Sequence, residues 1–189
     1  MRAAVLLALA VAAFAATAEA AATGAQGELE ALFPPNQATC YAMRFDAAWL
    51  AAHPDQSVVA IRVMRGYPSL RESDETSGQG EWPSMPAQLI VTFRDTGENA
   101  TPRQYGAEVE CRADREGAPD PKARCVIACD GGDFIPTRDA DGAMHFAIED
   151  GRSLRIAGGC TNHRELRALG TQKGDRIFTL PRQPLEACR

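Results

Sequence analysis

Apolar and polar residues alternate with a period of two along most of the chain. The clearest run covers residues 104–111, where Tyr105, Ala107, Val109 and Cys111 alternate with polar or small neighbours. This alternation is typical of an antiparallel strand with one face on a hydrophobic core and the other in water. The same period occurs in further short runs at residues 59–64, 88–94, 125–129, 143–148, 153–157 and 178–180.

Glycine-containing turns separate several of these runs. Asp130-Gly131-Gly132, Asp141-Gly142 and Asp150-Gly151 supply residues that tolerate the positive φ of tight hairpins. The stretch from Phe134 to Ile156 is therefore expected to form a three-stranded meander. About seven or eight short strands predict one mostly antiparallel β-barrel or sandwich.

One or two short helices are expected beside the strands. Asp46 is suited to the N-cap of a helix over residues 47–53, because its carboxylate can accept the unpaired amides of the first turn. Trp49 and Leu50 are expected to pack inward from this helix. A second short helix is expected at His163–Leu169.

The N-terminus has the three parts of a secretory signal. Arg2 is followed by an apolar run to Ala16 and by Ala18-Glu19-Ala20, a small-x-small cleavage site. Residues 1–20 are therefore predicted to be a signal peptide and the mature protein to be periplasmic or secreted. Residues 21–39 are expected to form a flexible N-terminal arm, and residues 40–189 a single β-rich domain.

Composition narrows the class of partner. Twenty basic and 25 acidic residues give a net charge of −5, with 45% hydrophobic residues. These values are typical of a folded globular chain and lack the basic footprint of a nucleic-acid binder. No segment after the signal is apolar enough to span a bilayer. We therefore expect no nucleic-acid partner and no membrane insertion after signal removal.

The cysteines predict a disulfide framework. An even number of cysteines in an exported chain indicates disulfides. The turn-rich segment between Cys111 and Cys125 favours a hairpin that joins them, and a Cys40–Cys188 bond would tie together the two ends of the domain. Cys129 and Cys160 remain as the third pair. The six cysteines are Cys40, Cys111, Cys125, Cys129, Cys160 and Cys188.

Several short elements carry a resemblance. They are Cys40-Tyr41, Asp46-x-x-x-Leu50-x-x-His53-Pro54-x-Gln56-x-Val58, Cys129-Asp130-Gly131-Gly132-x-Phe134, Gly158-Gly159-Cys160 and Phe178-x-Leu180. The pattern resembles a group of small exported bacterial proteins of uncharacterised function, and its most specific part is Cys-Asp-Gly-Gly-x-Phe. The resemblance implies a single β-rich exported domain and transfers no catalytic residue.

The sequence shows no catalytic constellation. It lacks the Gly-x-Ser-x-Gly and Ser-x-x-Lys motifs of serine nucleophiles. Glu108 and Glu110 share a polar strand face, which leaves open an envelope-polymer hydrolase as an alternative. Residues 137–142 match a calcium loop only in part, and an Asp-Gly hairpin turn explains them better. We expect no cofactor and no metal site.

One long polar segment, residues 68–86, does not fit a compact hairpin. Loops of this length in compact domains are often functional. Trp82 and Met85 lie in it, and His145 is expected on an outer strand face; these three are the candidate binding residues. The sequence therefore predicts a non-enzymatic exported domain that binds a protein partner or a small ligand. A purely structural role is the remaining alternative.

Overall fold

The computed structural model describes residues 24–66, 85–94, 101–114, 121–156 and 167–189. Its elements are α1 (Ala25–Leu32), β1 (Thr39–Arg44), α2 (Ala47–Ala52), β2 (Val58–Arg65), β3 (Met85–Phe93), β4 (Arg103–Ala113), β5 (Ala123–Ile127), β6 (Gly132–Arg138), β7 (Met144–Ala147), β8 (Leu154–Arg155), β9 (Ala168–Leu169), the 3₁₀ turn η1 (Lys173–Asp175), β10 (Ile177–Leu180) and the 3₁₀ turn η2 (Leu185–Cys188).

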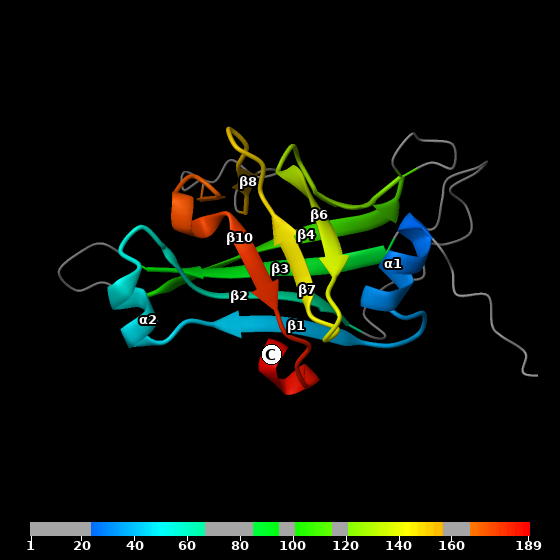
Figure 1. The fold of residues 1–189 in the computed structure, drawn as a ribbon, viewed down its shortest axis with the longest axis horizontal. Helices are drawn as coiled ribbons and strands as arrows, with labels where there is room; N and C mark the ends of the chain where they lie inside the picture. Colours follow the sequence, from blue (N-terminus) through cyan, green and yellow to red (C-terminus); the bar gives the residue numbers. More distant parts are fainter. Residues whose placement is uncertain (1–23, 67–84, 95–100, 115–120, 157–166) are drawn as a thin grey trace, which may run out of the picture.

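Eight of these strands form one antiparallel sheet in the order β1-β2-β3-β4-β5-β6-β7-β10. The sheet curls into a nearly closed barrel, in which β6, β7 and β10 cross in front of the layer formed by β1 to β4 (Figure 1). The predicted fold class is therefore confirmed: mostly β, antiparallel and barrel-like, with short helices.

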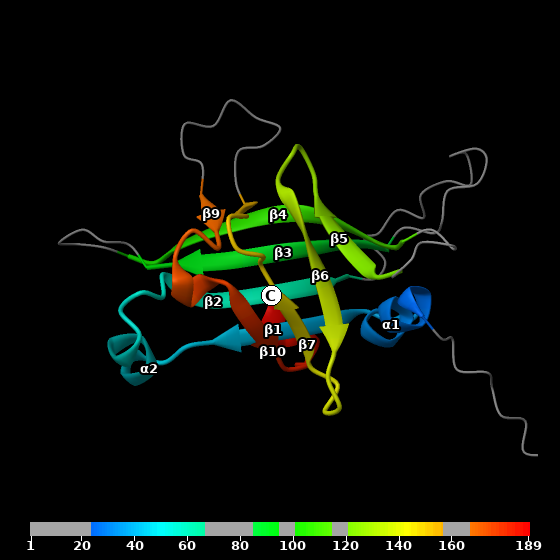
Figure 2. The ribbon, with the colours of Figure 1, turned by 45° about the horizontal axis from the view of Figure 1, so that its top comes forward.

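The barrel closes where β1, the first strand in the order, meets the chain just after β10, the last strand. Tyr41 and Arg182 form an isolated antiparallel bridge there. A backbone hydrogen bond from Ala42 N to Pro181 O, 3.1 Å long, supports the bridge. The two strands are oblique to one another, and beyond this bridge they diverge toward α2 (Figures 1 and 2). We call the line between β1 and β10 the seam.

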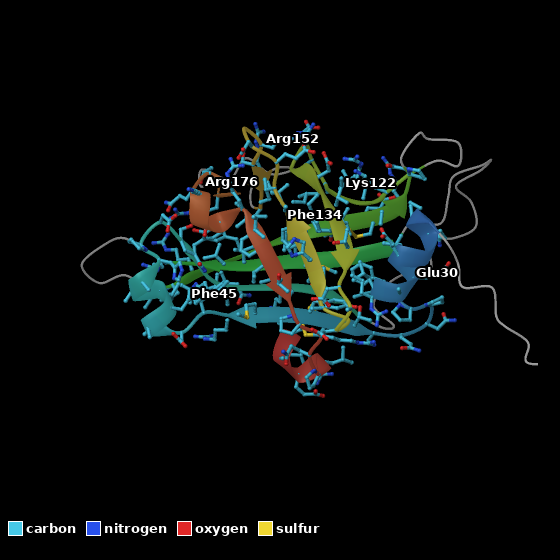
Figure 3. The ribbon with its side chains drawn as sticks, in the orientation of Figure 1. Glu30, Phe45, Lys122, Phe134, Arg152 and Arg176 are labelled. Atoms are coloured by element: carbon cyan, nitrogen blue, oxygen red, sulfur yellow. A yellow bond between two sulfur atoms is a disulfide. The ribbon has the colours of Figure 1, made fainter. Side chains whose placement is uncertain are left out.

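Side chains fill the interior of the barrel. Phe134, Phe146 and Phe178 form a row of rings with centroid separations of 4.6 and 5.2 Å, and all three are at most 2% exposed. Figure 3 places Phe134 of β6 in the middle of the molecule. Val91 and Ile156 are buried in the same cluster. The filled interior leaves the outer surface as the place for a ligand.

The expectation of a flexible arm over residues 21–39 is wrong for the part that the structure describes. α1 lies at one end of the barrel (Figure 1), and Leu29, Leu32 and Phe33 on its inner side are fully buried. Tyr41 Oη donates a hydrogen bond of 2.7 Å to Leu32 O. A helix of eight residues is marginal by itself, so this one depends on tertiary packing, which its short sequence does not predict.

The expected meander from Phe134 to Ile156 is also corrected. β6 and β7 pair as expected, but the next neighbour of β7 is β10. β8 instead pairs with β9 in a separate two-stranded sheet. Ala168–Leu169, expected at the end of a second helix, forms β9 because its backbone pairs with β8.

Two of the predicted disulfides are confirmed. Cys111 and Cys125 face each other in the register of β4 and β5 and are bonded. The Cys40–Cys188 bond, with Cα atoms 5.9 Å apart, attaches η2 to β1. Cys129 is also disulfide-bonded, but the predicted partner Cys160 lies outside the described residues, as do the signal peptide and most of the long polar segment.

A buried carboxylate joins the end of the chain to the start of β2. Asp175 is 1% exposed, and its oxygens accept hydrogen bonds from Ser57 N (2.9 Å), Val58 N (3.0 Å) and the Ser57 hydroxyl. The next residue back, Gly174, lies so close to Gln56 that a Cβ atom would be 2.9 Å from its backbone N. Only glycine permits this approach, which brings the carboxylate to its donors.

Replacing this carboxylate should destabilise the fold strongly. Asp175→Ala leaves two backbone amides and a hydroxyl without their acceptor, and we expect a loss of about 3 kcal/mol in the free energy of unfolding by urea denaturation. The control is Asp150→Ala, which removes a fully exposed carboxylate paired with Arg176 and should cost no more than about 0.5 kcal/mol. Equal effects of the two substitutions would contradict the role of Asp175.

Tyr41 should make stability fall in alkali. Burial raises the pKa of its phenol above the ordinary value of 10.0, against the lowering effect of Arg182 and Arg138. The unfolded chain therefore loses this proton at lower pH than the folded chain. The stabilisation by the protonated Tyr41 phenol is complete below pH 10. Above pH 10, the free energy of unfolding should fall by up to about 1.4 kcal/mol per pH unit.

The matched variant is Tyr41→Phe. It lacks the titrating group and the hydrogen bond to Leu32, so it should be about 1 kcal/mol less stable at neutral pH. Its unfolding free energy should also change less above pH 10 than that of the parent protein. Parallel pH profiles for the two proteins would show that Tyr41 does not cause the alkaline loss.

Candidate binding groove

A groove of about 440 Å³ lies on the outer face of β1, β2 and β3, beside the seam. We call it the seam groove. A volume of this size is within the range of ligand pockets in proteins. Its lining residues are Ala42, Met43, Arg44, Ala60, Ile61, Arg62, Ile90, Thr92, Pro181, Gln183 and Ala187.

The hollow follows from small residues on the outer face of the sheet. Ala42 of β1 faces Arg62 of β2, and Arg44 of β1 faces Ala60 of β2. Side chains in these pairs point to the same face of the sheet. A short side chain therefore stands beside a long one in each pair, and the surface sinks between the two arginines.

The segment after β10 forms one wall of the groove. Pro181, Gln183 and Ala187 come from this segment and from η2. The Cys40–Cys188 disulfide and the hydrogen bond from Gln183 N to Cys40 O, 2.8 Å long, hold the segment against β1. The wall is therefore fixed covalently to the strand that forms the floor.

The lining of the groove carries two arginines and no Asp or Glu side chain. Arg44 is exposed and has no hydrogen-bond or ion-pair partner in the part of the chain that the structure describes. Arg62 donates to Gln104 Oε1 (3.3 Å) and more weakly to Arg189 O (3.5 Å), while its buried Nε has no partner. Guanidinium groups bind carboxylates through paired hydrogen bonds. The groove therefore suits an anionic group flanked by apolar surface.

An aromatic cluster flanks the groove where β1 runs into α2. The Trp49 ring is stacked between Phe45, at 6.0 Å, and His53, at 4.0 Å between centroids. Its Nε1 donates a hydrogen bond of 3.0 Å to Gln56 Oε1. Two ring contacts and one hydrogen bond therefore hold the indole, which is still 46% exposed. Figure 3 shows Phe45 beside α2.

The inward packing expected for Trp49 is wrong, because its side chain is 46% exposed. The helix itself is confirmed, and Asp46 caps it by accepting a hydrogen bond from Trp49 N (2.7 Å). Its other residues apart from Leu50 are alanines, and none of its residues is buried. Two large apolar side chains in so short a helix are too few to define a buried face, and no local pattern predicts the stacking.

Of the three candidate binding residues, the structure describes Met85 and His145, and it places them in different environments. Trp82 lies outside the described residues. Met85 begins β3 with its side chain 8% exposed and is part of the core. His145 is partly exposed on β7, where its Nδ1 lies 3.0 Å from Thr179 Oγ1. Sequence reasoning also missed both arginines of the groove as a pair, since only the register of β1 and β2 makes them neighbours.

The acidic candidates lie elsewhere. Glu108 and Glu110 are exposed on β4, and neither lines the seam groove. Asp139 closes a hairpin turn, because its Oδ1 accepts hydrogen bonds from Asp141 N (3.1 Å) and Ala143 N (2.7 Å). Within the described ranges no three His, Cys, Asp or Glu side chains are grouped so as to hold a metal ion.

No helix in the described part of the chain is long and apolar enough to cross a membrane. The chain was also compared with protein-family models, with curated proteins and with solved structures, and none of them matches it.

Proposed function

We propose that this protein is an exported, non-enzymatic binding protein that holds a carboxylate-bearing partner in the seam groove. The observation that carries the proposal is the pairing of Arg44 and Arg62 over a floor of small and apolar side chains, with no Asp or Glu side chain in the lining. The filled interior supports an outer site, and the disulfides support export to an oxidising compartment.

Three features support binding rather than catalysis. The groove lining offers no nucleophile activated by a neighbouring base and no pair of carboxylates for acid–base work. Its walls are held by a disulfide and a sheet, which favours a preformed surface with little ordering cost. The hydrolase alternative requires Glu108 and Glu110, which lie outside the groove, and therefore has less support.

The charge of the groove gives a direct binding test. The probe is a short, end-capped, fluorescent peptide of alternating Val and Glu, compared by anisotropy at low ionic strength with the same peptide carrying Lys in place of Glu. We expect the Glu peptide to bind and the Lys peptide not to. Arg62→Gln should weaken binding about tenfold, and the exposed Arg44→Gln about threefold.

The control variant is Arg155→Gln, which removes an equal charge from an exposed position on β8 outside the groove. It should bind the Glu peptide as well as the parent protein does. Binding that is equally weakened by Arg155→Gln and Arg62→Gln would reflect net charge alone and would refute a site in the groove. Absence of any binding of the Glu peptide would favour the purely structural alternative.

A further inference from the structure

The seam leaves part of the edge of β1 without a backbone partner. Phe45 N donates to Val59 O of the neighbouring β2. Backbone groups of alternate residues in a strand point to opposite sides, so those of Met43 face β2 as well, and those of Ala42 and Arg44 face the seam. Ala42 N is satisfied by Pro181 O at 3.1 Å.

In the part of the chain that the structure describes, the remaining backbone groups on this edge have no hydrogen-bond partner. Proline has no N–H, so Pro181 cannot return a hydrogen bond to Ala42 O. Among the described residues, no backbone hydrogen bond joins Arg44 N or Arg44 O to another strand across the seam. The edge at Arg44, just beyond the point where Pro181 stands opposite Ala42, is thus an unpaired template at the side of the groove.

β10 presents a second edge to the same seam. Ile148 N donates to Arg176 O, so the backbone groups of alternate residues from Arg176 onward face β7. Those of Ile177 and Thr179 therefore face β1, and no backbone hydrogen bond between them and β1 is formed in the described chain. The side chain of Ile177 is 67% exposed, and that of Met43 on the β1 side is 37% exposed.

The positive charge at this edge favours an acidic strand as its binding partner. Arg44 is the exposed end of β1, and a second copy of the chain paired edge to edge here would bring two Arg44 side chains together. An acidic strand would instead meet Arg44 directly. It would also meet Arg62, which lies one strand further in, beyond the short side chain of Ala42. Adjacent strands are about 4.8 Å apart, so an extended Glu side chain reaches across Ala42 toward the Arg62 guanidinium.

We infer that the groove binds an extended acidic peptide segment of a protein partner, which adds as a strand to the free edge of β1. This inference rests on the proposed function and specifies its partner. The partner's backbone pairs with Arg44 N and O, because Pro181 already stands opposite Ala42. An acidic side chain opposite Arg44 therefore meets that guanidinium directly and lies on the same outer face as Arg62.

The peptide backbone provides the first test. Two versions of the Val-Glu peptide carry N-methyl groups, one on every Val and the other on every Glu. Amides of alternate residues point to opposite edges, so pairing along one edge requires only one of the two sets. We expect one methylated peptide to lose at least tenfold in affinity and the other to bind within about twofold of the parent peptide.

The protein backbone provides the second test. Arg44→Pro removes the edge N–H as well as the charge, whereas Arg44→Gln removes only the charge. We expect Arg44→Pro to bind the Glu peptide about fivefold more weakly than Arg44→Gln. Thr179→Pro removes an edge N–H from β10 and is the matched control, which should leave affinity unchanged. Circular dichroism and thermal unfolding of each variant report whether the barrel is intact.

The outcomes separate this inference from the proposed function. If the Glu peptide binds but both methylated peptides bind alike, or if Arg44→Pro and Arg44→Gln are equivalent in folded protein, strand addition is wrong while the charged groove stands. If the Glu peptide fails to bind, both fail. A dimer in sedimentation experiments that Arg44→Gln strengthens would show that the edge is occupied by a second copy, and would overturn the assignment of a peptide partner.

Discussion

Two backbone hydrogen bonds and the Cys40–Cys188 disulfide hold the first and last strands of an eight-stranded sheet together over only a few residues. Pro181 stands within this short contact and prevents its extension, because it supplies no N–H to Ala42 O. The strands diverge beyond it. This short contact, with its disulfide and its proline, therefore closes the barrel covalently, fixes the wall of the seam groove and leaves the edge of β1 open.

The way the barrel is filled decides where binding can take place. α1 covers one end with Leu29 and Leu32, and the phenylalanine row occupies the middle. Protein interiors are close-packed, so a barrel filled by its own side chains offers a ligand little space inside. The outer face is different, because Ala42 and Ala60 stand beside long arginines and no element of the described ranges covers them. We therefore expect binding on the outer face of the sheet, which would otherwise contact only water.

Local patterns predicted much of the fold because strand formation depends on local alternation. The Cys111–Cys125 bond followed from a turn-rich segment between two apolar runs, and Asp46 followed from the chemistry of helix caps. Where local signals were weak, prediction failed. α1 has few large side chains and is stabilised by tertiary contacts, and Trp49 lies in a helix too short to define a buried side.

The candidate site depends on the pairing of strands, which local sequence patterns do not predict. Arg44 and Arg62 are eighteen positions apart, and nothing in the sequence marks them among the other arginines. The sequence by itself determined strands, turns and two of the disulfides, because each depends on neighbouring residues or on the count and placement of one residue type, and the export signal stays a prediction. Only the tertiary structure decided the register that makes the two arginines neighbours, the partner of β7 and the incomplete seam. These depend on which distant segments pair, and on a proline that ends their pairing.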